Sequence, residues 1–162
     1  MFGKKPTSNL MLLQNVNHGT NQKAKKNKFH ELERISQIMT DILFKEESYN
    51  IIGACMEVHK KLGCGFLESV YSEALELEFK KVNVPYEREK KLQVFYDNQS
   101  LNKYFKADFV CYHSIILELK ATKYLIDADS QQTLNNIKAT KFKLGLLVNF
   151  GELSLVHKRI LN

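Results

Sequence analysis

The sequence has few of the features that mark exported, membrane-bound or disulfide-stabilised proteins. Its 162 residues include no tryptophan, two prolines, seven glycines and three cysteines. No apolar run approaches the roughly 20 residues that a membrane-spanning helix requires. The best candidate for the core of a signal peptide, Leu10-Met11-Leu12-Leu13, is shorter than such cores normally are. We therefore expect neither secretion nor insertion into a membrane.

Common cysteine-, histidine- and serine-based motifs are also missing. Cys55, Cys64 and Cys111 form no CxxC pair, and their odd number does not suit a disulfide framework. The five histidines show no zinc-ligand spacing with them. The chain contains neither a GxxxxGK[ST] phosphate loop nor a GxSxG motif. These absences favour a reducing, cytoplasmic compartment.

What is present is the composition of one globular domain with a basic extension. Hydrophobic residues make up 44% and charged residues 26% of the chain. Six of the 24 basic side chains lie within residues 1–30, which contain no acid, and the other 18 are balanced by all 18 acidic side chains. We interpret residues 1–40 as a basic, mobile N-terminal arm and residues 41–162 as the folded domain. A solubilising tail or an over-extended gene start explains such an arm better than a dedicated binding role.

Apolar residues at helical spacing predict three helices in the folded domain, at about Lys45–Leu62, Phe66–Val82 and Ile126–Thr140. A further short helix is expected between Phe29 and Thr40. Alternating or continuous apolar residues predict five strands: Leu92–Tyr96, Tyr104–Cys111, Ile115–Lys120, Leu144–Asn149 and Ser154–Arg159. The order α-α-β-β-β-α-β-β predicts an α/β fold in which helices flank a mixed sheet.

The third predicted strand ends in charged residues that could take part in catalysis or metal binding. Alternation places Glu118 and Lys120 on the same face, with Leu119 on the other, and Asp108 lies on the preceding strand. Burying two charges at the end of an apolar strand is costly unless they pair with each other or bind a metal. From these three residues alone, a salt bridge and a metal site are equally good interpretations.

The surrounding motifs resemble the PD-(D/E)XK nuclease superfamily, in its branch named after the motif GxxExxY. The matching segments, in chain order, are Gly65–Tyr71 for GxxExxY, Ala107-Asp108 and Glu118–Ala121 for the catalytic D…ExK, Gln132–Asn135 for the glutamine helix, Gly145–Gly151 for the closing strand and turn, and Lys158–Ile160 near the end. The resemblance extends over about residues 43–162. GxxExxY alone is a weak signal, whereas the motifs in this order are specific.

The resemblance implies a restriction-endonuclease-like core and hydrolysis of phosphodiester bonds with Mg²⁺ or Mn²⁺. It implies that Asp108, Glu118, the Leu119 carbonyl and Glu68 serve the metal, because hard oxygen ligands suit such ions. Lys120 would orient or help to deprotonate the attacking water. Gln132 would hydrogen-bond the water or a phosphate. Tyr71 is expected to be plain core packing.

Two positions depart from the family pattern. Asp129 stands where this branch often has histidine, and Asn136 where it often has tyrosine. Capping of the helix is the better interpretation of Asp129, with metal ligation as the alternative. These departures affect substrate binding rather than the charged set.

The leading hypothesis is a metal-dependent nuclease acting on DNA, compatible with a homodimer. The alternatives are a nucleic-acid-binding or adaptor protein that keeps the fold without hydrolysis, and a structural partner in which Glu118 and Lys120 form only an ion pair. An intact set of charged residues favours the enzyme. The zero net charge of residues 31–162 weighs mildly against it, because nuclease bodies usually carry a basic stripe.

Overall fold

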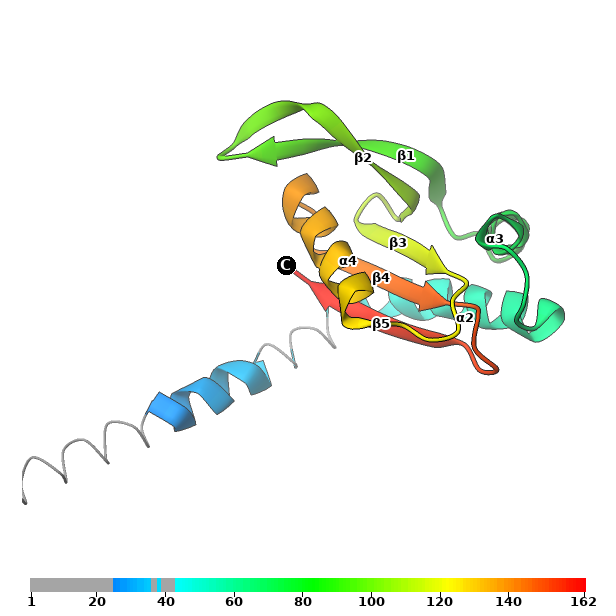
Figure 1. Ribbon diagram of the computed structural model, residues 1–162, viewed down its shortest axis with the longest axis horizontal. Coiled ribbons are helices and arrows are strands. Elements are labelled where there is room, and N and C mark those ends of the chain that lie inside the picture. The colour runs from blue at the N-terminus through cyan, green and yellow to red at the C-terminus, as the bar shows by residue number, and fades with distance from the viewer. Residues whose placement is uncertain (1–24, 36–37, 39–42) are drawn as a thin grey trace, which may run out of the picture. The chain divides into compact units, whose positions relative to one another are not determined.

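The computed structural model describes residues 25–35, 38 and 43–162 (Figure 1). By their contacts, residues 1–41 and 42–162 form two separate compact units. In the first unit, residues 25–35 are helical and exposed. The helix expected between Phe29 and Thr40 therefore agrees with the structure at residues 29–35 and 38, and its remaining positions lie outside the described residues.

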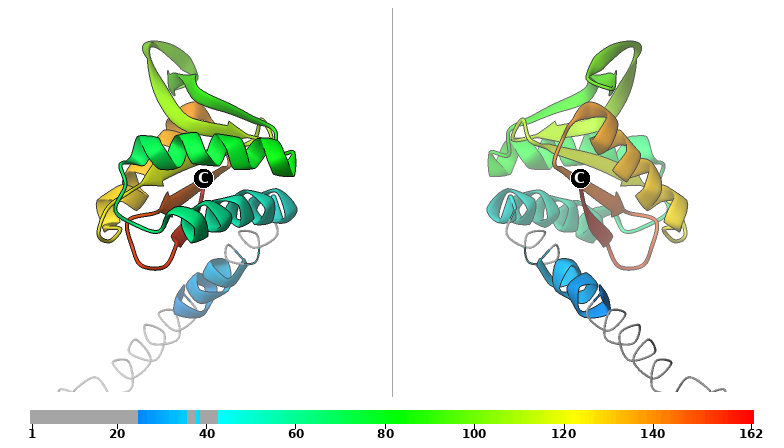
Figure 2. Two further views of the ribbon diagram at one scale, coloured as in Figure 1. Left: turned by 90° about the vertical axis from the view of Figure 1, so that its right-hand side faces the viewer. Right: turned by 90° about the vertical axis from the view of Figure 1, so that its left-hand side faces the viewer.

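The second unit begins with two helices, as the sequence predicts. Helix α2 (Lys45–Leu62) buries Ile51, Cys55 and Val58 on one face, and it ends at Gly63, whose φ of 70° suits glycine. Helix α3 (Glu68–Val82) begins two residues later than expected and places basic residues in its last turn, where they meet the negative end of the helix dipole. The two helices pack against each other (Figure 2).

The sheet contains five strands in the sequential order β1-β2-β3-β4-β5. These are β1 (Tyr86–Tyr96), β2 (Gln99–Cys111), β3 (Ile115–Lys120), β4 (Leu144–Asn149) and β5 (Val156–Leu161). Only the β3–β4 pair is parallel, because helix α4 (Asp127–Thr140) provides the crossover between these two strands. The mixed sheet flanked by helices confirms the predicted α/β fold, which is consistent with a restriction-endonuclease-like core.

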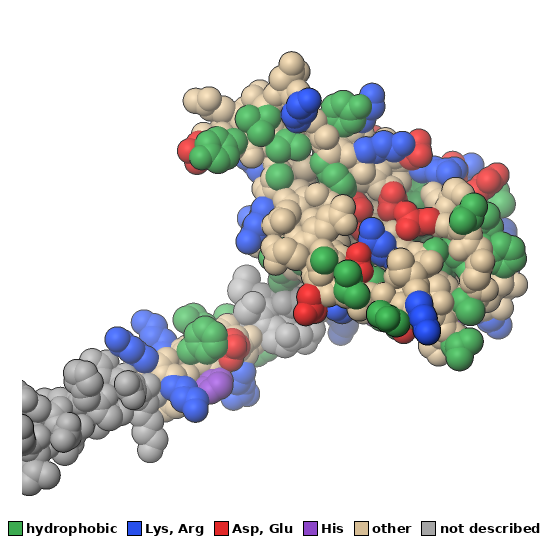
Figure 3. Space-filling model, in the orientation of Figure 1, with side chains coloured by type: hydrophobic (Ala, Val, Ile, Leu, Met, Phe, Trp, Pro, Cys, Tyr) green, Lys and Arg blue, Asp and Glu red, His purple; other side chains and the backbone are tan. Residues whose placement is uncertain are grey.

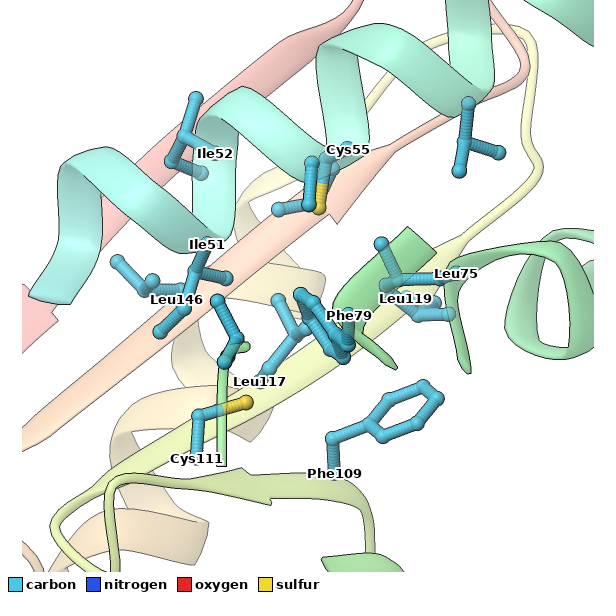
Figure 4. Close-up of a cluster of buried hydrophobic side chains, with 14 of the residues drawn as sticks. Ile51, Ile52, Cys55, Leu75, Phe79, Phe109, Cys111, Leu117, Leu119 and Leu146 are labelled. Atoms are coloured by element: carbon cyan, nitrogen blue, oxygen red, sulfur yellow. The ribbon is translucent and has the colours of Figure 1, made fainter. Parts of the chain in front are cut away.

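Both faces of the sheet are covered. On one face, α2 and α3 pack over Phe109, Leu117 and Leu119 together with side chains of β4 (Figure 4). On the other face, Ile137 of α4 packs with Ile116 and with residues of the first two strands. Alternation along β3 therefore sends Leu117 and Leu119 towards α2 and α3, and the intervening positions towards α4.

The β1–β2 hairpin is longer than the sequence predicts. Its strands begin at Tyr86 and Gln99, whereas the periodicity predicts starts at Leu92 and Tyr104. The hairpin extends away from the other strands and arches beside α4 (Figure 1). Strand β5 is also displaced, because it begins at Val156 rather than Ser154. Among the described residues, no helix has the length and apolar character needed to cross a membrane.

Candidate active site

The site is built on the last residues of β3. Leu119 is buried, whereas Glu118 and Lys120 are half-buried and lie on the face that α4 covers in part. The strand stays in place up to this point because Glu118, Leu119 and Lys120 pair with Leu147, Val148 and Asn149 of β4. The two charged side chains therefore project from a rigid part of the sheet.

Asp108 reaches the same place from β2. The pairing of β2 with β3 runs from Cys111↔Ile115 to Phe109↔Leu117 and stops there. Beyond it, the Asp108 carboxylate takes over the role of the missing strand partner, because its Oδ2 accepts a hydrogen bond of 2.8 Å from the Leu119 amide. The two strands thus separate at Asp108, and its carboxylate remains beside Glu118.

Glu68 belongs to a third element, because it is the first residue of α3. The loop before it is held by Tyr71, whose hydroxyl donates to the Gly63 carbonyl at 2.9 Å and accepts from the Phe66 amide at 3.2 Å. The Tyr71 ring is fully buried and stacks on Phe150 with 4.6 Å between centroids. Tyr71 therefore packs in the core, as predicted, and fixes the loop that leads to Glu68.

Burial and neighbouring charges raise the pKa values of the three carboxyl groups. Burial first, and then the nearby Asp108 charge, raises the pKa of Glu118 to about 8, although Lys120 opposes the shift. Burial also raises the pKa of Asp108, against the Leu119 hydrogen bond and the charge of Lys120. The pKa of Glu68 is raised by burial and by Asp108, and Lys120 again acts in the opposite direction. Glu68, Asp108, Glu118 and Lys120 therefore form one electrostatic cluster, which we call the acid–lysine cluster.

In the space-filling view, acidic and basic side chains lie next to each other over the region of β3 (Figure 3). The Glu118 Oε1 atom is buried and has no hydrogen-bond partner in the described part of the chain. A buried carboxylate oxygen without a partner costs free energy, and a bound cation would remove that cost. Across residues 25–35, 38 and 43–162, however, no three His, Cys, Asp or Glu side chains lie close enough together to enclose a metal ion.

Comparison with models of known protein families assigns the chain to one of them. The model of the PD-(D/E)XK nuclease superfamily matches residues 45–160, which include every residue of the acid–lysine cluster. The chain belongs to the PD-(D/E)XK nuclease superfamily. No curated protein and no solved structure matches it.

In this PD-(D/E)XK domain, the helix after the cluster carries two further residues that the sequence singled out. Gln132 is exposed on α4, and among the described residues no hydrogen bond joins it to the acid–lysine cluster. Asp129 caps the helix, because its Oδ2 accepts a 3.0 Å hydrogen bond from the Ile126 amide. The capping interpretation of Asp129 is therefore confirmed.

The sequence places Asn149 in the cleft of this PD-(D/E)XK site, but it does not predict that Asn149 joins the loops at the end of the site. Asn149 is fully buried, and its side-chain oxygen accepts from the amides of Thr122 and Gly151. Its side-chain nitrogen donates to the Thr122 carbonyl at 2.9 Å and to Glu152 at 3.0 Å. Gly151 must be glycine, because a Cβ there would lie 2.2 Å from the Thr122 carbonyl oxygen. A polar residue ending a wholly apolar strand was the available signal.

Proposed function

We propose that this protein is a nuclease that uses Mg²⁺ or Mn²⁺ to hydrolyse phosphodiester bonds in DNA. One observation carries the proposal: the structure brings Asp108, Glu118 and Lys120 together at the end of β3, in a chain that belongs to a nuclease superfamily. We also propose that it belongs to the GxxExxY branch of that superfamily, on the motif at residues 65–71.

The donor set fits a hard divalent cation. Mg²⁺ is usually bound through one or two carboxylates and keeps several waters, so it does not need a cage of three acidic side chains. Asp108 and Glu118 would hold it, with the main-chain carbonyl of Leu119 as a further oxygen ligand and Glu68 as a ligand or a partner of a bound water. Burial raises the pKa values of all three carboxyl groups, and the charge of Asp108 adds to the shifts of Glu68 and Glu118, so a bound cation would favour their ionised forms. When bound, the ion polarises a phosphate oxygen and makes a coordinated water more acidic.

The other residues act on the water and the phosphate. Lys120 shares a face with Glu118, so its ammonium can orient the attacking water and offset the charge that develops on the phosphate. Gln132, exposed on α4, is proposed to hydrogen-bond the water or a substrate phosphate. Glu68 stands at the N-terminus of α3, where it can hold a proton or a water opposite Asp108.

The experiment measures cleavage and metal binding separately. The protein is incubated with single- and double-stranded DNA and RNA in Mg²⁺, Mn²⁺ or EDTA, and Mn²⁺ binding is titrated by calorimetry. Asp108→Asn and Glu118→Gln remove ligands, so both should weaken metal binding and abolish cleavage. Lys120→Met should lower cleavage by at least about 10²-fold and leave Mn²⁺ binding nearly intact.

Lys123→Met is the matched control, because Lys123 is exposed in the loop after β3. It should cleave DNA like the unaltered protein. Full activity in Lys120→Met would contradict the proposed role of the lysine. Nucleic-acid binding without cleavage in any metal would favour the alternative, a binding protein that retains the fold.

A further inference from the structure

The outer part of the β1–β2 hairpin carries a net positive charge. Residues 90–106 contain four lysines and one aspartate, whereas the other positions of residues 42–162 contain 13 basic and 14 acidic side chains. The excess positive charge of the folded unit therefore lies in the outer part of the hairpin. Positive charge that is concentrated in this way favours binding of a polyanion at the hairpin.

The pairing register shows which side of the hairpin is free. Leu92 and Phe105 lie opposite each other and pack with the residues of α4. Lys91 pairs with Lys106, and Gln93 with Tyr104, so these four side chains lie on the other face, where all are exposed. We define the basic-aromatic face as Lys91, Tyr104 and Lys106.

This face has features that a purely structural surface would avoid. Like charges directly opposite each other in a sheet are destabilising, yet Lys91 faces Lys106. Glu89 pairs with Lys106 at 3.0 Å, but among the described residues no carboxylate pairs with Lys91. The Lys91 ammonium instead lies 4.7 Å from the centre of the Tyr104 ring, which is 59% exposed. A large exposed aromatic ring beside a cation, on a face that carries a second lysine, is an arrangement that can bind a base and its phosphates.

The basic-aromatic face adjoins the acid–lysine cluster. Tyr104 and Asp108 belong to the same strand and are four residues apart, which is about 13 Å along β2. The charges of Lys106 and Glu89 both act on the Asp108 carboxyl group, so the near end of the face lies beside that group. In the space-filling view, basic and hydrophobic side chains lie next to one another over the hairpin (Figure 3).

We infer that the basic-aromatic face binds single-stranded nucleic acid that leads away from the active site. A base stacks on the Tyr104 ring in the position that Lys91 holds, and the Lys91 ammonium moves to the adjacent phosphate on its flexible stem. Lys106 contacts the next phosphate towards Asp108. Bases within a duplex are already stacked on one another, so the tyrosine selects single strands. The inference rests on the proposed nuclease function for its direction, but its test does not depend on cleavage.

The test measures binding of the full chain to fluorescent oligonucleotides by anisotropy, in EDTA so that the strands stay intact. Single-stranded DNA, single-stranded RNA and duplex DNA of one sequence are compared. Tyr104→Ala should weaken binding of single strands about tenfold and of duplex much less, whereas Tyr104→Phe should bind normally. Tyr49→Ala, which removes an exposed tyrosine from α2, is the matched control and should bind like the unaltered protein.

The lysines are tested through salt dependence. The double change Lys91→Gln and Lys106→Gln should reduce the slope of log K against log salt by about 1.4, at about 0.7 for each phosphate contact with a single strand. Lys60→Gln and Lys45→Gln together, both exposed on α2, should leave the slope unchanged. Thermal melts establish that each variant is folded, and Tyr104→Leu replaces Tyr104→Ala if the latter is not.

Unaltered single-strand affinity in Tyr104→Ala or Tyr104→Leu would overturn the inference, as would binding of duplex in preference to single strands. Equal losses for DNA and RNA would show recognition of any single strand, and unequal losses would show which sugar the face accepts. If the unaltered protein cleaves no substrate but loses single-strand binding on loss of Tyr104, the binding inference stands and the proposed hydrolysis fails. If the unaltered protein cleaves nucleic acid but loss of Tyr104 does not change single-strand binding, the proposed hydrolysis stands and the binding inference fails.

Discussion

The buried strands β3 and β4 and the outer part of the β1–β2 hairpin are held in different ways. All six residues of β4 are buried, and β3 pairs with it along its whole length between covering helices. In β2, the first six residues are exposed, and the strand pairs only with β1 over that stretch. Backbone hydrogen bonds are present in both regions, so the difference lies in apolar burial, which is the larger contributor to stability.

The acid–lysine cluster lies at the boundary between the exposed hairpin and the buried part of the sheet. Asp108 is four residues beyond the six exposed residues that begin β2, close to the point where the projecting hairpin joins the buried sheet. Glu118 and Lys120 stand on the buried side of that boundary. The comparison indicates that Glu118 and Lys120 are held by the buried part of the sheet, while the neighbouring surface of the hairpin remains exposed.

The largest effect is expected when the same kind of substitution, leucine to alanine, is made in β4 and in the hairpin. Leu146→Ala empties a fully buried site in β4 and should lower the free energy of unfolding by about 3 kcal/mol or more. Leu101→Ala, in the hairpin, should change it by less than about 0.5 kcal/mol, because that side chain is 41% exposed. Denaturant titrations of the two variants measure the difference. Equal losses would show that the hairpin contributes to the same core.

A second prediction concerns pH at the boundary. The pKa of Glu118 is about 8 in the folded protein, against an ordinary value of 4.5, so folding favours its protonated form. The ionisation penalty is absent below pH 4.5, grows as the pH rises to 8, and is complete above that. Glu118→Gln cannot ionise, so in metal-free buffer it should gain stability over the unaltered protein by up to about 1.4 kcal/mol for each pH unit in this window.

Denaturant titrations at several pH values between 4 and 9 provide the measurement. Glu152→Gln is a suitable control, because Glu152 lies outside the acid–lysine cluster and its substitution retains an oxygen to accept from Asn149. A stability difference between Glu118→Gln and the unaltered protein that does not vary with pH would contradict the burial of the Glu118 charge.

A third prediction distinguishes function from structure at Glu68. If this residue serves the metal or its water, Glu68→Gln should lower cleavage by about tenfold or more and leave the melting temperature nearly unchanged. If it only stabilises the start of α3, the melting temperature should fall and activity should fall in proportion. Cleavage rates and thermal melts of the same preparation separate the two outcomes.

The smallest effect on stability is expected from the N-terminal arm. A chain that begins at Met39 should fold and keep its activity, because residues 42–162 form a compact unit of their own. The six lysines of residues 1–30 would add about 5 to the salt slope if all contacted duplex phosphates, and we expect about half of that or less. Affinity for one duplex at several salt concentrations, with and without residues 1–38, measures this. An insoluble short chain would mean that part of the arm belongs to the fold.

Periodicity predicted the buried elements well and the exposed ones poorly. Helix α2 and strands β3 and β4 have the predicted bounds, because dense apolar spacing marks both their type and their ends. The first residues of β1 and of β2 were missed, since strand segments that are polar along much of their length carry no such alternation of apolar residues. Cross-strand pairing, which the sequence does not reveal directly, extends the hairpin.

The same limit applies to the candidate site. The motif order identified Asp108, Glu118 and Lys120, and the alternation of β3 put the last two on one face. The hydrogen bond from the Leu119 amide to Asp108 could not be predicted, because it depends on where β2 and β3 separate. The part played by Asn149 depends on two loops that meet only in the folded chain.

The hydrogen bonds of the Asn149 side chain also have a consequence for local motion. The loops after β3 and β4 share one side-chain amide, so opening either loop breaks hydrogen bonds of the other. The amide protons of Thr122 and Gly151 should then exchange with solvent at matching, slow rates, although Thr122 lies in an exposed loop. The two loops behave as a single cooperative unit, whose opening would release the end of β3 and Lys120 with it.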